Sequence, residues 1–99
     1  MMTPSMICLA ATIFFEARDQ PIEGQLAVAD VVMNRVESPR WPDEICAVVF
    51  QPSQFSFTHD GKSDNYRKYT SNVGDRQAIG IAEEIAKSVI KGGRLGLTS

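Results

Sequence analysis

The chain has 99 residues, which is the size of one small domain, and 43% of them are hydrophobic while 22% are charged. This composition is typical of a globular protein, and we treat residues 1–99 as a single domain. Twelve acidic and ten basic residues give a formal net charge of −2, and the basic residues are scattered along the chain. The charge pattern therefore argues against nucleic-acid binding.

The first predicted helix runs from Pro4 to about Ala17. Thr3 is a suitable N-cap, Pro4 suits the first helical position, and apolar residues follow at helical spacing. The apolar run over 6–15 lacks a basic leader and a small-residue cleavage site, so we do not interpret it as a signal peptide. It is also too short to span a bilayer, and we predict a core helix.

A single carboxylate, Glu16, stands where this apolar helix ends. A carboxyl group in such a place is expected to be partly desolvated, which favours its protonated form. The carbonyls at the C-terminal end of a helix act in the same direction, because negative charge is unfavourable beside them. A protonated carboxyl can serve as a general acid. The alternative is a surface glutamate that pairs with Arg18 or Arg35.

A second helix is predicted to start with Asp19 and Pro21, as the first helix starts with Thr3 and Pro4. Glu23 and Gln25 lie in its early part. Additional valines widen its apolar face, so we expect this helix to be buried on more than one side. The predicted core stripe consists of Ile22, Leu26, Ala29, Met33 and Val36, widened by Val28, Val31 and Val32.

The proline-rich stretch 38–42 ends this pattern, and a short helix is predicted over 43–50 with its aliphatic residues inward. One cysteine, Cys46, lies in this helix and the other, Cys8, lies in the first helix. Their spacing does not decide whether they pair, and we favour two buried thiols that act as small hydrophobic residues. No close pair of ligands supports a metal site.

Residues 54–58 alternate between apolar and polar, which predicts a short strand or extended segment. Gln54, Ser56 and Phe57 would present an amide, a hydroxyl and an aromatic face, which together suit a sugar ring. The alternative is a core strand with Phe55 and Phe57 turned inward. The fold class expected from all these elements is α+β and mainly helical.

The polar segment 62–74 is predicted to be a flexible excursion. A last helix follows, capped by Asp75 and ending at Gly92 and Gly93. Its apolar positions are Ala78, Ile79, Ala82, Ile85, Ala86 and Val89.

Several short motifs occur together in an unusual order, and the chain resembles the cell wall hydrolase family typified by the spore cortex-lytic enzyme SleB. The match is dense over 13–57 and weaker over 75–93. The segments that carry it are FEAR (15–18), PIEGQLAVA (21–29), VMNRV (32–36), SPRWP (38–42), ICAVVFQ (45–51) and QFSF (54–57).

The resemblance implies a lysozyme-like cleft that acts on peptidoglycan glycan strands, with Glu16 as the catalytic acid. The implied reaction is that of a lytic transglycosylase, which cuts between N-acetylmuramic acid and N-acetylglucosamine and leaves a 1,6-anhydro sugar. Sugar contacts are expected from Gln54, Ser56, Phe57 and Gln25. No cofactor and no metal are implied, and the expected place of action is the bacterial cell wall, in the periplasm or outside the cell.

The chain also departs from the family. Asp19-Gln20 stands where Gly-Glu is usual, Ser53 where Gly is usual before Gln-Phe, and Phe57 where Trp is frequent. Family members usually continue beyond a segment like 97–99. We therefore expect that a further segment or a partner chain completes the cleft, and phage-encoded lysins are one setting for such short forms.

Three alternatives remain open at this point. The first is a muramidase that hydrolyses with a second carboxylate, and the second is a non-catalytic glycan-binding remnant. The third is a structural or phage-assembly domain in which Glu16 pairs with an arginine. The carboxylates available for hydrolysis are Asp30, Asp43, Asp60 and Asp64.

Overall fold

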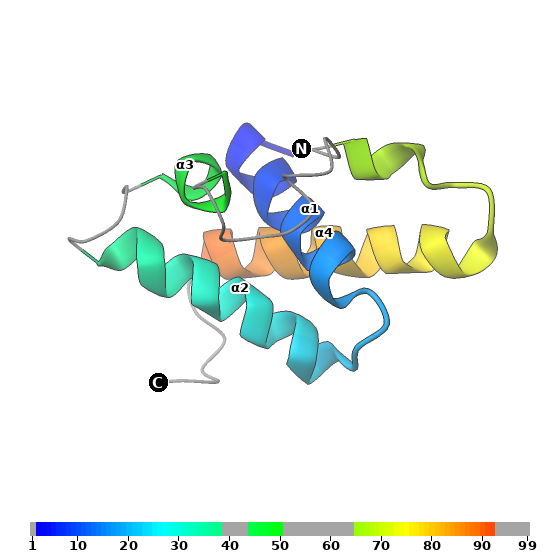
Figure 1. The fold of residues 1–99 in the computed structure, drawn as a ribbon, viewed down its shortest axis with the longest axis horizontal. Coiled ribbons are helices and arrows are strands. Elements are labelled where there is room, and N and C mark those ends of the chain that lie inside the picture. Colours follow the sequence, from blue (N-terminus) through cyan, green and yellow to red (C-terminus); the bar gives the residue numbers. More distant parts are fainter. Residues whose placement is uncertain (1, 39–43, 51–64, 93–99) are drawn as a thin grey trace.

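The computed structural model describes residues 2–38, 44–50 and 65–92, which form a small, mainly helical domain (Figure 1). No strand occurs in these described ranges, and the extended segment predicted over 54–58 lies outside them. In chain order the elements are α1 (Pro4–Ala17), α2 (Ile22–Glu37), α3 (Ile45–Val49), the 3-10 helix η2 (Asn65–Lys68) and α4 (Val73–Gly92).

Helix α1 is the centre of the fold, because α2, α3, η2 and α4 all pack against it. In Figure 1 it crosses in front of α4, the longest helix. The predicted start of α1 is confirmed, since the Thr3 hydroxyl accepts a hydrogen bond from the Met6 N–H at 3.2 Å. Leu9, Ile13 and Phe14 are completely buried. The apolar run predicted to be a core helix is therefore the core of this domain.

Helix α2 begins at Ile22, later than predicted, and Pro21 precedes it without a capping side chain. Its core stripe is confirmed at Ala29, which is completely buried, and at the partly buried residues that flank it. The predicted burial was wrong for Ile22 and Val31, which are 47% and 42% exposed. Ile22 faces a surface groove, and Val31 points about 100° away from the buried Val32 because successive helical residues differ by that angle.

A disulfide bond joins Cys8 in α1 to Cys46 in α3, with 5.3 Å between the two Cα atoms. The interpretation as two buried thiols was therefore wrong. The 38-residue separation of the cysteines gives no information about their distance in space. Helix α3 packs on α1 through Ile45, Val48 and Val49, as predicted, and this packing brings the two sulfur atoms together.

The segment before α4 is ordered by an aromatic anchor, so the predicted flexible excursion was wrong over the described residues 65–72. Tyr66 in η2 is completely buried, and its ring centroid lies 6.1 Å from that of Phe14. Its hydroxyl donates a hydrogen bond to Glu83 Oε2 at 2.7 Å. The polar composition of the segment concealed this single buried side chain.

Helix α4 starts at Val73, and the side chain of the preceding Asn72 caps it. The Asn72 Oδ1 atom accepts a hydrogen bond from the Asp75 N–H at 2.7 Å, and Asn72 Nδ2 donates to Asp75 Oδ2 at 3.2 Å. The prediction of Asp75 as the cap was therefore wrong by three positions. The predicted core stripe is confirmed, since the buried residues of α4 are Ala78, Ala82, Ile85, Ala86 and Val89.

Among the described residues, no helix combines the length and the apolar character that crossing a bilayer requires.

Candidate functional site

Glu16 occupies the last turn of α1, and its side chain is exposed. The neighbouring Phe14 and Ala17 are buried, so the helix surface changes character at this residue. Leu9, seven residues earlier, lies about two turns back on the same side of the helix and is completely buried. The packing that covers this side of α1 ends before the last turn. The Glu16 side chain therefore lies on the surface of the domain, at the boundary of the buried part of α1.

An aromatic cluster supports the turn that carries Glu16. Phe14 and Phe15 meet edge to face with centroids 5.2 Å apart, and the Tyr69 ring lies 5.7 Å from Phe14 and 5.6 Å from Phe15. Together with the buried Tyr66, these rings join the end of α1 to the segment before α4. Sequence reasoning missed the two tyrosines, although two aromatic residues within an otherwise polar stretch were a usable signal.

Arg18 extends this support on the far side of the cluster. Its guanidinium carbon lies 4.8 Å from the centroid of the Phe14 ring, which is a cation–π distance. Its Nη1 atom lies 3.8 Å from Asp75 Oδ1, where both side chains are partly exposed. An ion pair of this kind contributes little energy by itself.

Gln25 points into the protein. Its side chain is 3% exposed, and its Nε2 atom donates a hydrogen bond to the Gln20 carbonyl at 3.1 Å. Its Oε1 atom is buried without a hydrogen-bond partner among residues 2–38, 44–50 and 65–92. In this arrangement Gln25 connects α2 to the turn after Glu16. The other three predicted sugar contacts, Gln54, Ser56 and Phe57, lie outside the described residues.

A second polar cluster links η2 to α4. The Glu83 carboxylate accepts hydrogen bonds from the Tyr66 hydroxyl and from Arg67 Nε, both at 2.7 Å. Burial, and then the neighbouring Glu83 carboxylate, raise the pKa of Tyr66 well above its ordinary range. The hydrogen bond to Glu83 also raises the pKa of Arg67. Tyr66 therefore remains a neutral hydrogen-bond donor, and this cluster stabilises the fold without a proton to exchange.

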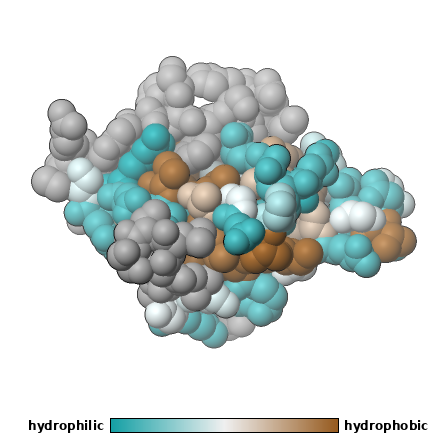
Figure 2. All heavy atoms as spheres, turned by 90° about the horizontal axis from the view of Figure 1, so that it is seen from below, coloured by the Kyte–Doolittle hydropathy of each residue, from teal (hydrophilic) through white to brown (hydrophobic). Residues whose placement is uncertain are grey.

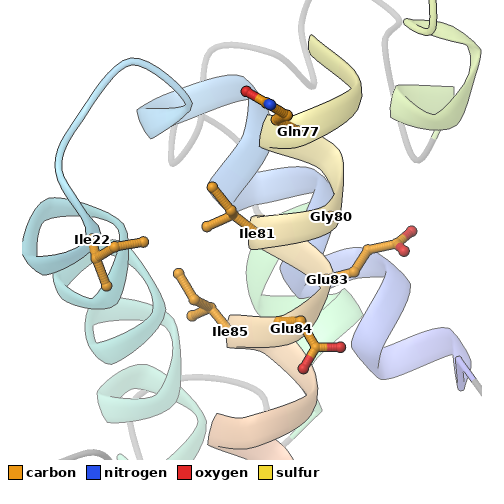
Figure 3. A pocket seen from close by; sticks show the side chains of 7 residues that line it. All are labelled: Ile22, Gln77, Gly80, Ile81, Glu83, Glu84 and Ile85. Atoms are coloured by element: carbon orange, nitrogen blue, oxygen red, sulfur yellow. The ribbon is translucent and has the colours of Figure 1, made fainter. Parts of the chain in front are cut away.

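A surface groove of about 670 Å³ lies beside α4, and Glu16 is not among the residues that line it. Ile22, Ile81 and Ile85 point toward it from α2 and α4 (Figure 3). The molecular face turned downward in Figure 1 carries a strip of hydrophobic atoms bordered by hydrophilic ones (Figure 2). Nothing in the groove resembles an acid–base site, because Glu83 is engaged by Tyr66 and Arg67 and Glu84 by Lys87 at 3.1 Å. We assign no part of a reaction to it.

The described part of the chain also contains no group of three or more histidine, cysteine, aspartate or glutamate residues arranged to hold a metal ion. Helix α1 itself contains one carboxylate, that of Glu16, in its last turn.

Comparison with known proteins identifies the family. Residues 19–98 match the model of the Cell Wall Hydrolase family, which is most of the chain. The chain belongs to this cell wall hydrolase family. The resemblance found in the sequence is therefore confirmed. Glu16 lies three residues before the matched region, so the match itself does not include the proposed acid.

Similar proteins include the spore cortex-lytic enzymes of Bacillus subtilis, Halalkalibacterium halodurans and Oceanobacillus iheyensis. Each is 43% identical to this cell wall hydrolase family member over 54 residues, which is 54% of the chain. The aligned part covers 18%, 16% and 20% of these relatives, respectively, so the chain spans about a fifth or less of their length. No solved structure matches the chain significantly.

Proposed function

We propose that this domain cleaves the glycan strands of peptidoglycan, between N-acetylmuramic acid and N-acetylglucosamine, and that Glu16 is the acid that protonates the glycosidic oxygen. The observation that carries the proposal is the exposed carboxylate at the end of the most buried helix in a cell wall hydrolase family member. The last turn of a helix gives this side chain a defined position, and an exposed side chain is accessible to a polymer that cannot enter a closed cavity.

The proposed reaction is that of a lytic transglycosylase and uses one carboxyl group twice. The Glu16 carboxyl first donates its proton to the glycosidic oxygen, and the bond from that oxygen to the anomeric carbon breaks. The resulting carboxylate then accepts the proton of the muramic 6-hydroxyl as that oxygen bonds to the anomeric carbon. The product is a 1,6-anhydro sugar, water is not consumed, and Glu16 regains its proton.

The exposure of Glu16 has a consequence for this mechanism. Because the Glu16 side chain lies on the surface, a bound glycan strand would cover it and exclude water from it before the proton is transferred. A lysozyme-like cleft, in which the bound glycan strand covers the catalytic acid, provides this arrangement. We propose that Gln54, Ser56 and Phe57 belong to such a cleft as sugar contacts.

Hydrolysis would require a second carboxylate to activate water, at roughly 5–5.5 Å for retention or 6.5–9.5 Å for inversion. Of the four aspartates considered for this role, the structure describes Asp30, which is only 6% exposed. A buried carboxylate is poorly placed to activate a water molecule beside a surface-bound strand. This observation argues against Asp30 as the second carboxylate, while Asp43, Asp60 and Asp64 lie outside the described residues.

The test uses the purified protein and its Glu16→Gln variant on isolated peptidoglycan, with the released muropeptides identified by mass spectrometry. The amide is similar in size to the carboxyl group but cannot donate the proton. We expect wild-type protein to release anhydro-muropeptides, which are lighter by one water than the hydrolysis products, and Glu16→Gln to release none.

Two other results would change the proposal. Reducing-end muropeptides that disappear with Glu16→Gln would retain Glu16 as the acid but make the enzyme a hydrolase. No release from folded wild-type protein would refute catalysis. Cosedimentation of that protein with peptidoglycan would then support a glycan-binding role.

A further inference from the structure

Gln20 joins the end of α1 to the start of α2 through both of its backbone polar groups. Its N–H donates a hydrogen bond to the Ala17 carbonyl at 2.9 Å, and its own carbonyl accepts one from Gln25 Nε2 at 3.1 Å. The Gln20 side chain also lies against Gly24, where an added Cβ would come within 2.9 Å of Gln20 Cβ. A larger residue at position 24 would therefore displace this turn from α2.

The hydrogen bond from Gln25 to Gln20 is partly buried. Gln25 is 3% exposed, and a buried amide that lost its hydrogen-bond partner would destabilise this arrangement of the turn. Pro21 supplies no side-chain cap at the start of α2, so the join is not held by the usual capping interaction. The side chain of Gln25, one turn into the helix, holds the turn instead.

Glu16 lies directly before Ala17, the residue to which Gln20 is hydrogen-bonded. The last turn of α1 is thus fixed on one side by Gln20 and Gln25. On the other side Arg18 lies over Phe14 and beside Asp75. A small shift of this turn would change the direction of the Glu16 carboxyl group.

We propose that Gln25 is a positioning residue for Glu16. Its hydrogen bond to Gln20 fixes the turn after α1 and thereby the angle at which the Glu16 carboxyl group meets the glycosidic oxygen. This inference rests on the proposed function. It differs from the expectation that Gln25 contacts sugar, and its inward-facing, buried side chain supports the difference.

The two roles predict different kinetics. A residue that contacts sugar in both the ground state and the transition state raises KM when it is lost, with kcat unchanged. A residue that aligns the acid lowers kcat and leaves KM unchanged. Misplacement of a reacting group by about 1 Å can reduce the rate by about 100-fold.

The experiment compares Gln25→Leu and Gly24→Ala with wild type on a soluble glycan oligomer prepared from peptidoglycan. Gln25→Leu removes the hydrogen bond but retains the bulk of the side chain. Gly24→Ala adds a methyl group against Gln20 and so displaces the same turn. Because alanine favours the helical conformation more than glycine does, this variant should fold even if Gln25→Leu does not. Gln77→Leu, the same chemical change at an exposed position of α4, is the matched control.

Activities are measured well below the Tm of every variant, and exchange of the Gln20 amide hydrogen is followed by NMR. For both test variants we expect kcat to fall by about 10- to 100-fold while KM stays within about twofold. The Gln20 amide hydrogen should exchange about tenfold faster, because the turn opens more often. Gln77→Leu should match wild type in every measurement.

Three outcomes would overturn the inference. A raised KM with unchanged kcat would make Gln25 a substrate contact. Faster exchange at Gln20 with unchanged kcat would show that the turn does not align the acid. A folded wild-type protein no more active than Glu16→Gln would remove the proposed function, and the positioning role with it.

Discussion

The disulfide bond between Cys8 and Cys46 should contribute a large part of the stability of this domain. Reduction is the cleanest perturbation, because both sulfur atoms remain in the packed interface between α1 and α3 and only the covalent link is lost. The link closes a loop with a sequence separation of 38 residues. In the chain-entropy description a loop of this length stabilises the folded state by about 4 kcal/mol at 25 °C.

This magnitude is large compared with the whole stability of a domain of this size, which is typically about 5–15 kcal/mol. Since about 1 kcal/mol shifts the Tm of a domain of 60–100 residues by roughly 4–8 °C, reduction should lower the Tm by about 15–30 °C. In this description the stabilisation arises because the bond reduces the conformational entropy of the unfolded chain, and not from a contact in the folded state.

The assay is thermal unfolding followed by circular dichroism, with and without reductant, while alkylation and mass spectrometry count the free thiols. A Cys8→Ala and Cys46→Ala double variant should unfold at or below the Tm of the reduced wild type, and reductant should not affect it. A fully reduced wild-type protein whose Tm falls by less than about 5 °C would refute the loop-entropy reasoning. Free thiols in the untreated protein would show that the bond does not form.

Three further predictions concern single residues. Glu16→Gln should abolish glycan cleavage but change the Tm by no more than about 4 °C, because exposed side chains contribute little to folding; activity and unfolding assays on one sample test both parts. Tyr66→Phe should lower the free energy of unfolding by about 1.5–3 kcal/mol in urea titrations, because it removes a buried hydrogen bond to a charged group. The Tyr66 pKa is raised above its ordinary 10.0, so the unfolded chain loses this proton first as the pH rises. The stability advantage of wild type over Tyr66→Phe should therefore be complete below pH 10 and shrink above it, and a constant difference would contradict this assignment. Asn72→Ala should lower the free energy of unfolding by about 1 kcal/mol in the same titrations, because it removes the cap of α4. Thr70→Ala serves as its control, because the contact of Thr70 with Arg76 is made by the backbone carbonyl and is retained.

The sequence predicted the helices well because burial leaves a periodic pattern in the residues themselves. The apolar spacing in α1, α3 and α4 corresponds to the buried faces that the structure contains. The errors occurred where tertiary structure decides the outcome. The pairing of the two cysteines depends on how α3 docks on α1, and the burial of Tyr66 depends on its place beside Phe14 and Glu83.

The candidate site could be predicted less well than the fold. The position of Glu16 at the end of α1 followed from the pattern, but its exposure did not, because the sequence does not show where neighbouring elements stop covering a helix. Gln25 was predicted to contact sugar, and its inward direction was visible only in the structure. The sugar contacts proposed over 54–57 remain predictions.

Helix α1 places nine of its fourteen residues in the interior, so selection for folding alone restricts most of the substitutions this helix can accept. Glu16 is an exception, because its side chain is exposed while the adjacent Ala17 is 3% exposed. A library of variants sorted for stable expression should tolerate many residues at position 16 and few at position 17. The same library sorted for lysis of bacterial cells should tolerate few at either. If position 16 accepts many residues under selection for expression but few under selection for lysis, Glu16 is needed for activity and not for folding. Position 17, next to it, would then be restricted by folding.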